Sequence, residues 1–269
     1  MADPERFASL SRGLAQGVAQ HPDLIGLALL GSASDDAAAR RDEWSDHDFF
    51  AIIADGRADA VRPDLSWLPD QASLALTARE GELGFVAVYD DGHVMEFAFA
   101  EASELSGALA GEATIVVDDD LRTVSALIDR SRERAAAADR FDPVNDARLV
   151  LVKLLIGVGR ARRGEVLVAG QFVRTWAAQH LIRAVRGRHP ERSGSERDRI
   201  DPARRFERDF PEWGEVIAHA VAQEVEPAAR ELYRLLRRLE PGWPEFPSRA
   251  ADAVATRLGW GRDSDASGS

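Results

Sequence analysis

Two aspartates spaced one residue apart carry the clearest chemical signal in this sequence. Asp46 and Asp48 flank His47, directly before the apolar run Phe49–Ile53. Alternate residues of a strand point to the same side, so both carboxylates would face one place while His47 faces away. Adjacent carboxylates repel unless a cation lies between them, and Mg²⁺ takes oxygen ligands together with water and substrate phosphates. The pair predicts a magnesium site, although Asp-x-Asp is also common in turns.

A third carboxylate is available from Glu96, which stands inside the apolar run Val94–Phe99. An unpaired charge buried in such a strand would be costly. Ligation to a metal, or contact with a metal-bound group, would remove that cost. Glu96 is therefore a candidate third member of the site.

The pair Gly31-Ser32 follows the apolar run Leu24–Leu30. Glycine lets the backbone approach a ligand closely, and the amide and hydroxyl of Ser32, near the start of a helix, can hold phosphate oxygens. An ordinary strand-to-helix turn with a serine cap would show the same two residues. The pair gains meaning only in combination with the three carboxylates.

These residues must be positioned by a strand-rich first half. Apolar runs bounded by Gly, Asp and Pro predict strands, and Asp90-Asp91-Gly92 predicts the turn of a β-hairpin. Helical spacing predicts the first helix and a short second one. The expected helices are residues 4–20 and 35–41, and the expected strands are residues 24–30, 48–53, 72–77, 85–89, 93–99 and 114–117.

The character of the chain changes near residue 140, where long patterns rich in Ala, Leu and Arg begin. Residues 145–161, 166–186 and 226–239 carry apolar side chains at helical spacing. We expect an α+β protein: a catalytic domain with a mixed sheet flanked by helices over residues 1–140, and a helical bundle completing the substrate site over residues 141–262. The short polar segment 263–269 is expected to be a disordered tail.

Composition limits the possible partners. The net charge is −12, and it is uneven: residues 1–142 hold 12 basic and 28 acidic side chains, whereas residues 143–269 hold 22 and 18. An acidic first half repels nucleic acid and attracts metal ions and cationic small molecules, but it is also what a solvated acidic surface looks like. The chain has no cysteine, which excludes disulfides and cysteine-based zinc sites. No apolar run predicts export or membrane insertion, so a cytoplasmic protein is expected.

Taken together, Gly31-Ser32, the stretch Ser45–Phe49 and Glu96 resemble the signature of the DNA polymerase beta-like nucleotidyltransferases. Within that superfamily the chain is most similar to the aminoglycoside 6-adenylyltransferase and lincosamide nucleotidyltransferase groups, which implies a role in antibiotic resistance. That closer likeness rests on the two-part layout, on a strand ending in Asp118-Asp119-Asp120, and on Phe141–Asp146 leading into a helix with Lys153 and Arg160.

The resemblance implies magnesium-dependent transfer of AMP from ATP to a hydroxyl of a small, possibly cationic acceptor, with release of pyrophosphate. Asp46 and Asp48 would hold two Mg²⁺ ions, and Gly31 and Ser32 would contact the nucleotide. Glu96 matches the third acidic position, which is either a metal ligand or the general base. The resemblance leaves these two roles open.

Two residues of the second half are further candidates. Asp146 could contact the acceptor or act as a second base, or it could be an acid interacting with the helix dipole. Lys153, the one lysine of the chain, could contact the triphosphate or extend along the bundle surface.

Other classes of function stay open. The spacing of Arg174 and His180 is similar to the Arg…His pair of HEPN-type ribonucleases, but these residues do not fall on one helical face, and Trp176 and Leu181 beside them are expected in the core. A nucleotide sensor or a modifier of proteins could keep the same fold. Either a monomer or a homodimer is compatible with the sequence.

Overall fold

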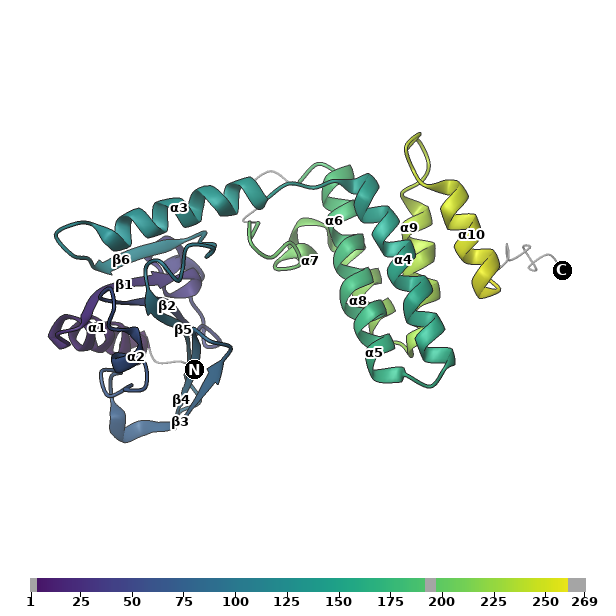
Figure 1. The fold of residues 1–269 in the computed structure, drawn as a ribbon. Helices are drawn as coiled ribbons and strands as arrows, with labels where there is room; N and C mark the ends of the chain where they lie inside the picture. The colour runs from purple at the N-terminus through teal and green to yellow at the C-terminus, as the bar shows by residue number, and fades with distance from the viewer. Residues whose placement is uncertain (1–3, 192–196, 261–269) are drawn as a thin grey trace. The chain divides into compact units, whose positions relative to one another are not determined.

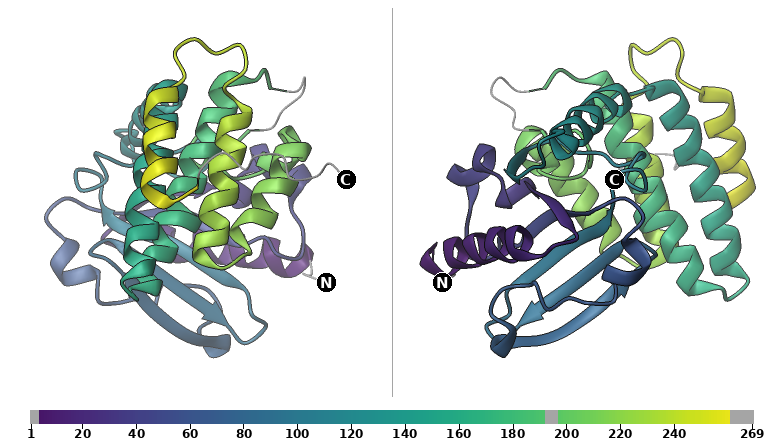
Figure 2. Two further views of the ribbon diagram at one scale, coloured as in Figure 1. Left: turned by 90° about the vertical axis from the view of Figure 1, so that its right-hand side faces the viewer. Right: turned by 60° about the vertical axis from the view of Figure 1, so that its left-hand side comes forward.

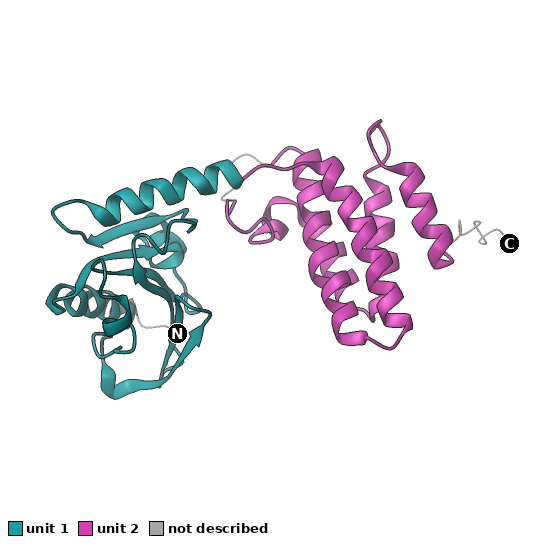
Figure 3. Ribbon diagram, in the orientation of Figure 1, with its two compact units in different colours: residues 1–138 teal, residues 139–269 magenta. Residues whose placement is uncertain are grey.

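The computed structural model describes residues 4–191 and 197–260 (Figure 1). The chain divides into two compact units, residues 1–138 and residues 139–269, coloured separately in Figure 3. Unit 1 contains every strand found in the described residues, and the helices dominate unit 2. The expected tail, 263–269, lies outside the described residues. Within the described ranges, none of the helices is long and apolar enough to cross a membrane.

Unit 1 is built on one mixed sheet with the strand order β3-β4-β5-β2-β1-β6. β2 and β5 run parallel, and the other neighbouring strands run antiparallel. The α+β class expected from the sequence is thereby confirmed. The strands are β1 (Leu24–Leu30), β2 (His47–Ile53), β3 (Leu74–Glu80), β4 (Gly84–Tyr89), β5 (Val94–Glu101) and β6 (Ala113–Val117).

Helix α1 (Pro4–Gln20) covers one face of this sheet. Its buried side chains Phe7, Leu10, Leu14 and Val18 recur at helical spacing and share a core with Leu27, Leu29, Phe49 and Phe97, among others. Burying a side chain of this kind contributes roughly 1.5–3 kcal/mol. Two glycines let α1 lie close to the loop before β3, since a Cβ on Gly17 would be 2.0 Å from the carbonyl oxygen of Trp67.

Helix α3 (Thr123–Ala138) covers part of the opposite face, as Figure 1 shows beside β6. Val124, Leu127 and Ile128 pack there with Ile52 of β2 and Ala100 of β5. These two strand residues lie toward the carboxyl ends of their strands. Asp48 and Glu96 lie on the same face, four residues earlier, and both keep contact with solvent. The sheet thus has an uncovered stretch where its acidic residues stand.

The strands and the first helix follow the sequence expectations closely. Residues 4–20 and 24–30 match α1 and β1, and the Asp90–Gly92 turn joins β4 and β5 in an antiparallel hairpin. The third strand begins at Leu74 rather than at residue 72, and the short helix expected over residues 35–41 is a 3-10 helix over Asp35–Arg40. Shorter elements of unit 1 are α2 (Ala58–Val61) and the 3-10 turns Gly31–Ala33 and Gln71–Ser73.

Unit 2 is a helical bundle around its own core, drawn in green to yellow in Figure 2. Helix α4 packs against α6, α9 and α10, and a π-helical turn at Gln171–Ala177 connects α5 to α6. Asp142 caps α4 by accepting from the amide of Asn145, and Pro143 occupies the first turn. The helices are α4 (Pro143–Arg162), α5 (Val166–Gly170), α6 (Ala178–Arg188), α7 (Phe206–Asp209), α8 (Pro211–Val221), α9 (Val225–Arg238) and α10 (Ser248–Leu258).

Candidate active site

Three carboxylates meet at the uncovered part of the sheet. Asp46, Asp48 and Glu96 each offer an oxygen atom, and these three atoms all lie within 4.8 Å of one another. The parallel register explains the meeting, because Asp48 of β2 is directly opposite Glu96 of β5. Partners in register point to the same face. The sequence expectation that these three residues form one cluster therefore agrees with the geometry.

The cluster is open to solvent. Asp46 and Asp48 are half-buried, and Glu96 is exposed. The expectation of a buried charge at Glu96 is wrong: its apolar neighbours Met95 and Phe97 point into the core on the other face, so strand alternation turns Glu96 outward. Three carboxylates at this separation form a hard, oxygen-only donor set that fits Mg²⁺, which completes its shell with water and phosphate.

The Gly31–Ser32 turn stands directly against the carboxylates. Leu30, the last residue of β1, pairs with Asp48. Gly31 follows with φ = 48°, and a Cβ there would be 3.3 Å from an Asp48 carboxylate oxygen. A glycine fits this left-handed conformation and this close approach. The Ser32 hydroxyl donates to the main-chain oxygen of Asp46 at 3.0 Å or to its Oδ1 at 3.1 Å. Ser32 thus contacts a candidate metal ligand, in contrast to a simple helix cap.

His47 faces the opposite side of the sheet, as the alternation predicts. Its side chain is fully buried, Nε2 lies 2.8 Å from the hydroxyl oxygen of Ser11, and Nδ1 lies 2.7 Å from Nε2 of His93. Burial, then His93 and the charge of Arg41, lower the pKa of His47 to about 3. His47 is therefore neutral at physiological pH and anchors the start of β2 in the core.

Two of the three consecutive aspartates after β6 have a capping role. Asp118 accepts from the amides of Val124 and Ser125, and Asp119 accepts from the amide of Thr123 at 2.7 Å. These contacts satisfy amides at the start of α3, which have no partner inside the helix. Partial burial opposes ionisation of Asp118, but the hydroxyl of Ser125 and three amides outweigh it and lower the pKa of that carboxyl.

Asp146 lies in unit 2 and is nearly fully buried. Its Oδ1 lies 2.9 Å from Nδ1 of His180 and 3.2 Å from Nε of Arg183. Its Oδ2 is buried and has no hydrogen-bond partner among the described residues. Asp146 of α4 thus contacts His180 and Arg183 of α6 inside unit 2. The sequence interpretations of Asp146, as an acceptor contact, a base or a helix-dipole acid, did not include these contacts.

Lys153 also lies in unit 2, beside two aromatic rings. Its Nζ is 5.4 Å from the ring centroid of Trp176 and 5.8 Å from that of Phe172, within the range of a cation–π interaction. Trp176 keeps 36% of its surface exposed, so the expectation that it lies in the core is wrong, whereas Leu181 is fully buried. The rings of Phe172 and Trp176 therefore contact the Lys153 ammonium group at the surface of α4.

Arg174 and His180 contact different partners. Arg174 donates from Nε to the carbonyl oxygen of Gln223 at 3.1 Å, and His180 bonds to Asp146. The π-helical turn that contains Arg174 adds to their separation around the axis. These contacts give the ribonuclease interpretation no support.

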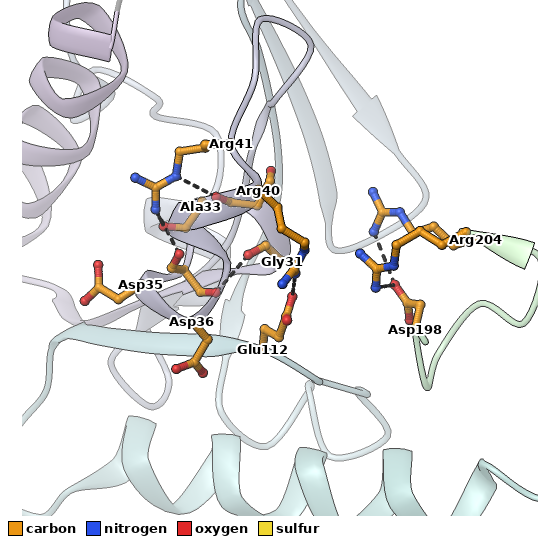
Figure 4. Close-up of polar contacts among 12 residues, drawn as sticks. Gly31, Ala33, Asp35, Asp36, Arg40, Arg41, Glu112, Asp198 and Arg204 are labelled. Atoms are coloured by element: carbon orange, nitrogen blue, oxygen red, sulfur yellow. Dashed lines mark hydrogen bonds and ion pairs between the residues drawn. The ribbon is translucent and has the colours of Figure 1, made fainter. Parts of the chain in front are cut away.

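One residue beside the candidate site that the sequence did not single out is Arg41. Its guanidinium donates to the carbonyl oxygens of Ser32, Ala33 and Ser34, as Figure 4 shows next to Ala33. Nothing in the sequence distinguishes Arg41 from the many other arginines, because its partners are main-chain atoms.

No family model matches the sequence, and no curated protein matches it. Among solved structures, the chain is similar to a nucleotidyltransferase-like protein from Exiguobacterium sibiricum 255-15, with 12% identity and a TM-score of 0.34 over 96% of this chain and 81% of that one. It is also similar to an aminoglycoside 6-adenyltransferase from Bacillus subtilis, with 12% identity and a TM-score of 0.30 over 95% of this chain and 92% of that one. Scores this low assign no activity to this chain.

Proposed function

We propose that this protein is a nucleotidyltransferase that transfers AMP from ATP to a hydroxyl of a small acceptor and releases pyrophosphate. One observation carries the proposal: the carboxylates of Asp46, Asp48 and Glu96 converge within 4.8 Å beside the Gly31–Ser32 turn. This is the constellation that the sequence shares with the DNA polymerase beta-like nucleotidyltransferases.

Each residue of the cluster has a role that suits its position. Asp46 and Asp48, with Glu96 beside them, would hold two Mg²⁺ ions, which when bound stabilise negative charge on the phosphates. Ser32, whose hydroxyl already contacts Asp46, would contact the nucleotide phosphates with Gly31. Fixed charges that stabilise the transition state in this way are usually the largest single contribution to the rate enhancement in such sites.

In the reaction, the acceptor oxygen forms a bond to the α-phosphorus while the bond from that phosphorus to the bridging oxygen breaks. Pyrophosphate leaves with the electron pair of the broken bond. The acceptor hydroxyl gives its proton to a carboxylate. Glu96, the exposed member of the cluster, would receive it in the alternative in which it is the general base and not a metal ligand.

The proposed acceptor is a small cationic molecule of the aminoglycoside type. Residues 1–142 carry 16 more acidic than basic side chains, a field that attracts polycations and repels a nucleic-acid backbone. The resemblance to antibiotic nucleotidyltransferases supports the same class of acceptor.

For unit 2 we propose contacts of Asp146 with the acceptor and of Lys153 with the triphosphate. Asp146→Asn should then raise KM for the acceptor, and Lys153→Gln should raise KM for ATP. Initial-rate kinetics with each substrate varied in turn separate the two effects. An unchanged KM for the acceptor in Asp146→Asn would contradict the acceptor contact and leave Asp146 only its contact with His180. An unchanged KM for ATP in Lys153→Gln would contradict the triphosphate contact and leave Lys153 only its contact with Trp176.

The test of the function is pyrophosphate release from each of the four nucleoside triphosphates with Mg²⁺, against a panel of aminoglycosides and lincosamides. We expect release with ATP that depends on one antibiotic and vanishes in Asp46→Asn. Nucleotide binding without release would contradict the proposed acceptor and favour a protein acceptor or a nucleotide sensor. Metal-independent cleavage of RNA would favour a ribonuclease.

A further inference from the structure

Arg41 holds the turn that lies against the carboxylates. Its Nε donates to the carbonyl oxygen of Ser32 at 2.8 Å, and its Nη2 lies 3.1 Å from that of Ala33 and 2.8 Å from that of Ser34. Three successive carbonyl groups therefore gather on one planar guanidinium, whose donors form a rigid fork. Figure 4 shows Arg41 and the hydrogen bonds that join it to the turn beside Ala33.

The turn is also fixed at its beginning. The amide of Gly31 donates to the carbonyl oxygen of Glu112 at 3.1 Å, and the Glu112 side chain pairs with Arg40 (Figure 4). The hydroxyl of Ser34 donates to the carbonyl oxygen of Gly31 at 2.8 Å. Arg41 in addition binds the carbonyl group of Ser32, the residue that reaches the candidate metal site.

From the turn, the connection runs to Asp46. The Ser32 hydroxyl contacts Oδ1 of Asp46 at 3.1 Å and its main-chain oxygen at 3.0 Å. A shift of the turn would therefore shift the position or the rotamer of this carboxylate. The link from Arg41 to Asp46 passes through a single residue.

A second connection runs through the hydrophobic core. The Arg41 guanidinium carbon lies 4.7 Å from the ring centroid of Phe7, and that ring stacks on His47 with a centroid distance of 3.8 Å and an interplanar angle of 21°. Phe7 and His47 are both buried. His47 separates Asp46 from Asp48 in the chain, so this stack fixes the strand segment that carries both carboxylates.

We propose that Arg41 is a positioning residue for the metal-binding carboxylates, acting through Ser32 on Asp46 and through Phe7 on the start of β2. The inference rests on the proposed metal site. Groups that orient metal ligands without touching the metal typically weaken metal binding 10- to 100-fold when they are removed. Arg41 acts one residue further from the metal, because its guanidinium binds the main-chain oxygens of the turn and Ser32 contacts Asp46.

The experiment is a calorimetric titration with Mn²⁺ of the nucleotide-free full chain and of its variants Arg41→Lys and Arg41→Met. It measures the Mn²⁺ affinity of each protein. Lysine keeps the charge but loses the planar fork of the guanidinium and its contact over the Phe7 ring. We expect both variants to bind Mn²⁺ about tenfold or more weakly than the unsubstituted chain. The thermal unfolding midpoint of each variant is measured in parallel, so that affinities are compared only between folded proteins.

The matched control is Arg62→Lys. Arg62 is another unit 1 arginine that donates to a main-chain carbonyl, that of Phe99, and pairs with Glu104. We expect it to leave the Mn²⁺ affinity unchanged. Equal loss in this control, or unchanged affinity in both folded Arg41 variants, would overturn the proposed role.

A double variant tests the route. If Arg41 acts through Ser32, then Arg41→Lys should cost less affinity in a Ser32→Ala background than it costs alone. Losses that multiply as if they were independent would overturn the Ser32 route.

Absence of Mn²⁺ binding by the unsubstituted chain would overturn the inference together with the metal site. Mn²⁺ binding without pyrophosphate release from any nucleotide would overturn only the proposed transfer, and Arg41 would be judged on affinity alone.

Discussion

At the scale of single residues, the candidate site depends on which way each side chain of two strands points. Asp48 and Glu96 share a face because β2 and β5 are parallel and in register at these positions. A slip of one residue would place Glu96 among the core residues and Met95 in solvent. The same alternation sends His47 to Phe7 and Ser11 on the other side.

The candidate metal ligands Asp48 and Glu96 should each contribute to metal binding. Glu96→Gln and Asp48→Asn should each weaken Mn²⁺ binding about tenfold or more, because each removes one charge from a cluster that spans 4.8 Å. Asp48→Asn should also lower turnover by about a thousandfold. Calorimetry and pyrophosphate release measure the two effects, with the exposed Asp59→Asn as control. Unchanged Mn²⁺ affinity in Glu96→Gln together with a lower kcat would make Glu96 the general base instead of a ligand.

At the scale of elements, α3 depends on the aspartates that precede it. Asp118 accepts from two amides in its first turn and from the Ser125 hydroxyl at 2.6 Å. We expect Asp118→Ala to lower the free energy of unfolding at neutral pH by about 1 kcal/mol. The exposed Asp120→Ala should have little effect.

The pH dependence of this cap follows from the lowered pKa of Asp118. Its stabilising contribution is present above the usual pKa of an aspartate, 3.8, and is lost as the pH falls through the lower value in the folded protein. Urea unfolding should therefore show a difference between the unsubstituted chain and Asp118→Ala at about pH 7 that shrinks toward about pH 3. A difference that persists undiminished in acid would contradict an ionic cap.

Close packing of helix α4 on the π-helical turn depends on Gly157. A Cβ there would be 2.6 Å from a methyl carbon of Val173, whereas a Cβ on Gly159 would meet nothing closer than 3.7 Å. Gly157→Ala should lower the free energy of unfolding by about 1–3 kcal/mol. Gly159→Ala should raise it by up to about 1 kcal/mol, because alanine favours the helix. Chemical unfolding of both variants measures the contrast, and equal effects would contradict the packing.

At the scale of the whole molecule, charge separates the two halves of the sequence. Residues 1–142 are strongly acidic, whereas residues 143–269 carry a small positive excess. Attraction of a polycationic acceptor by such a field is screened by salt. Raising the salt concentration from about 0.05 M to about 0.5 M should raise KM for an aminoglycoside several-fold and leave kcat nearly unchanged. Steady-state kinetics tests this, and a KM insensitive to salt would contradict electrostatic attraction.

The sequence alone located the carboxylates and most of the strands of unit 1, because alternation and turn residues are local signals. It placed the change to long helical patterns near residue 140, whereas the helical α3 already begins at Thr123 and belongs to unit 1. It missed α3, whose helical period is weak, and it missed α8 and α10, which have a helical period similar to that of α1 but are only 11 residues long.

Tertiary structure decided what no local pattern contains. The distance between Asp48 and Glu96 depends on the parallel pairing of β2 with β5, two strands that are separated in the sequence by β3 and β4. The exposure of Glu96 depends on tertiary packing, because α3 covers Ala100 further along β5. Asp146 binds His180 and Arg183 of another helix, and Arg41 binds three main-chain carbonyl groups. Main-chain atoms are the same at every residue, so a sequence cannot show which of them a side chain will bind.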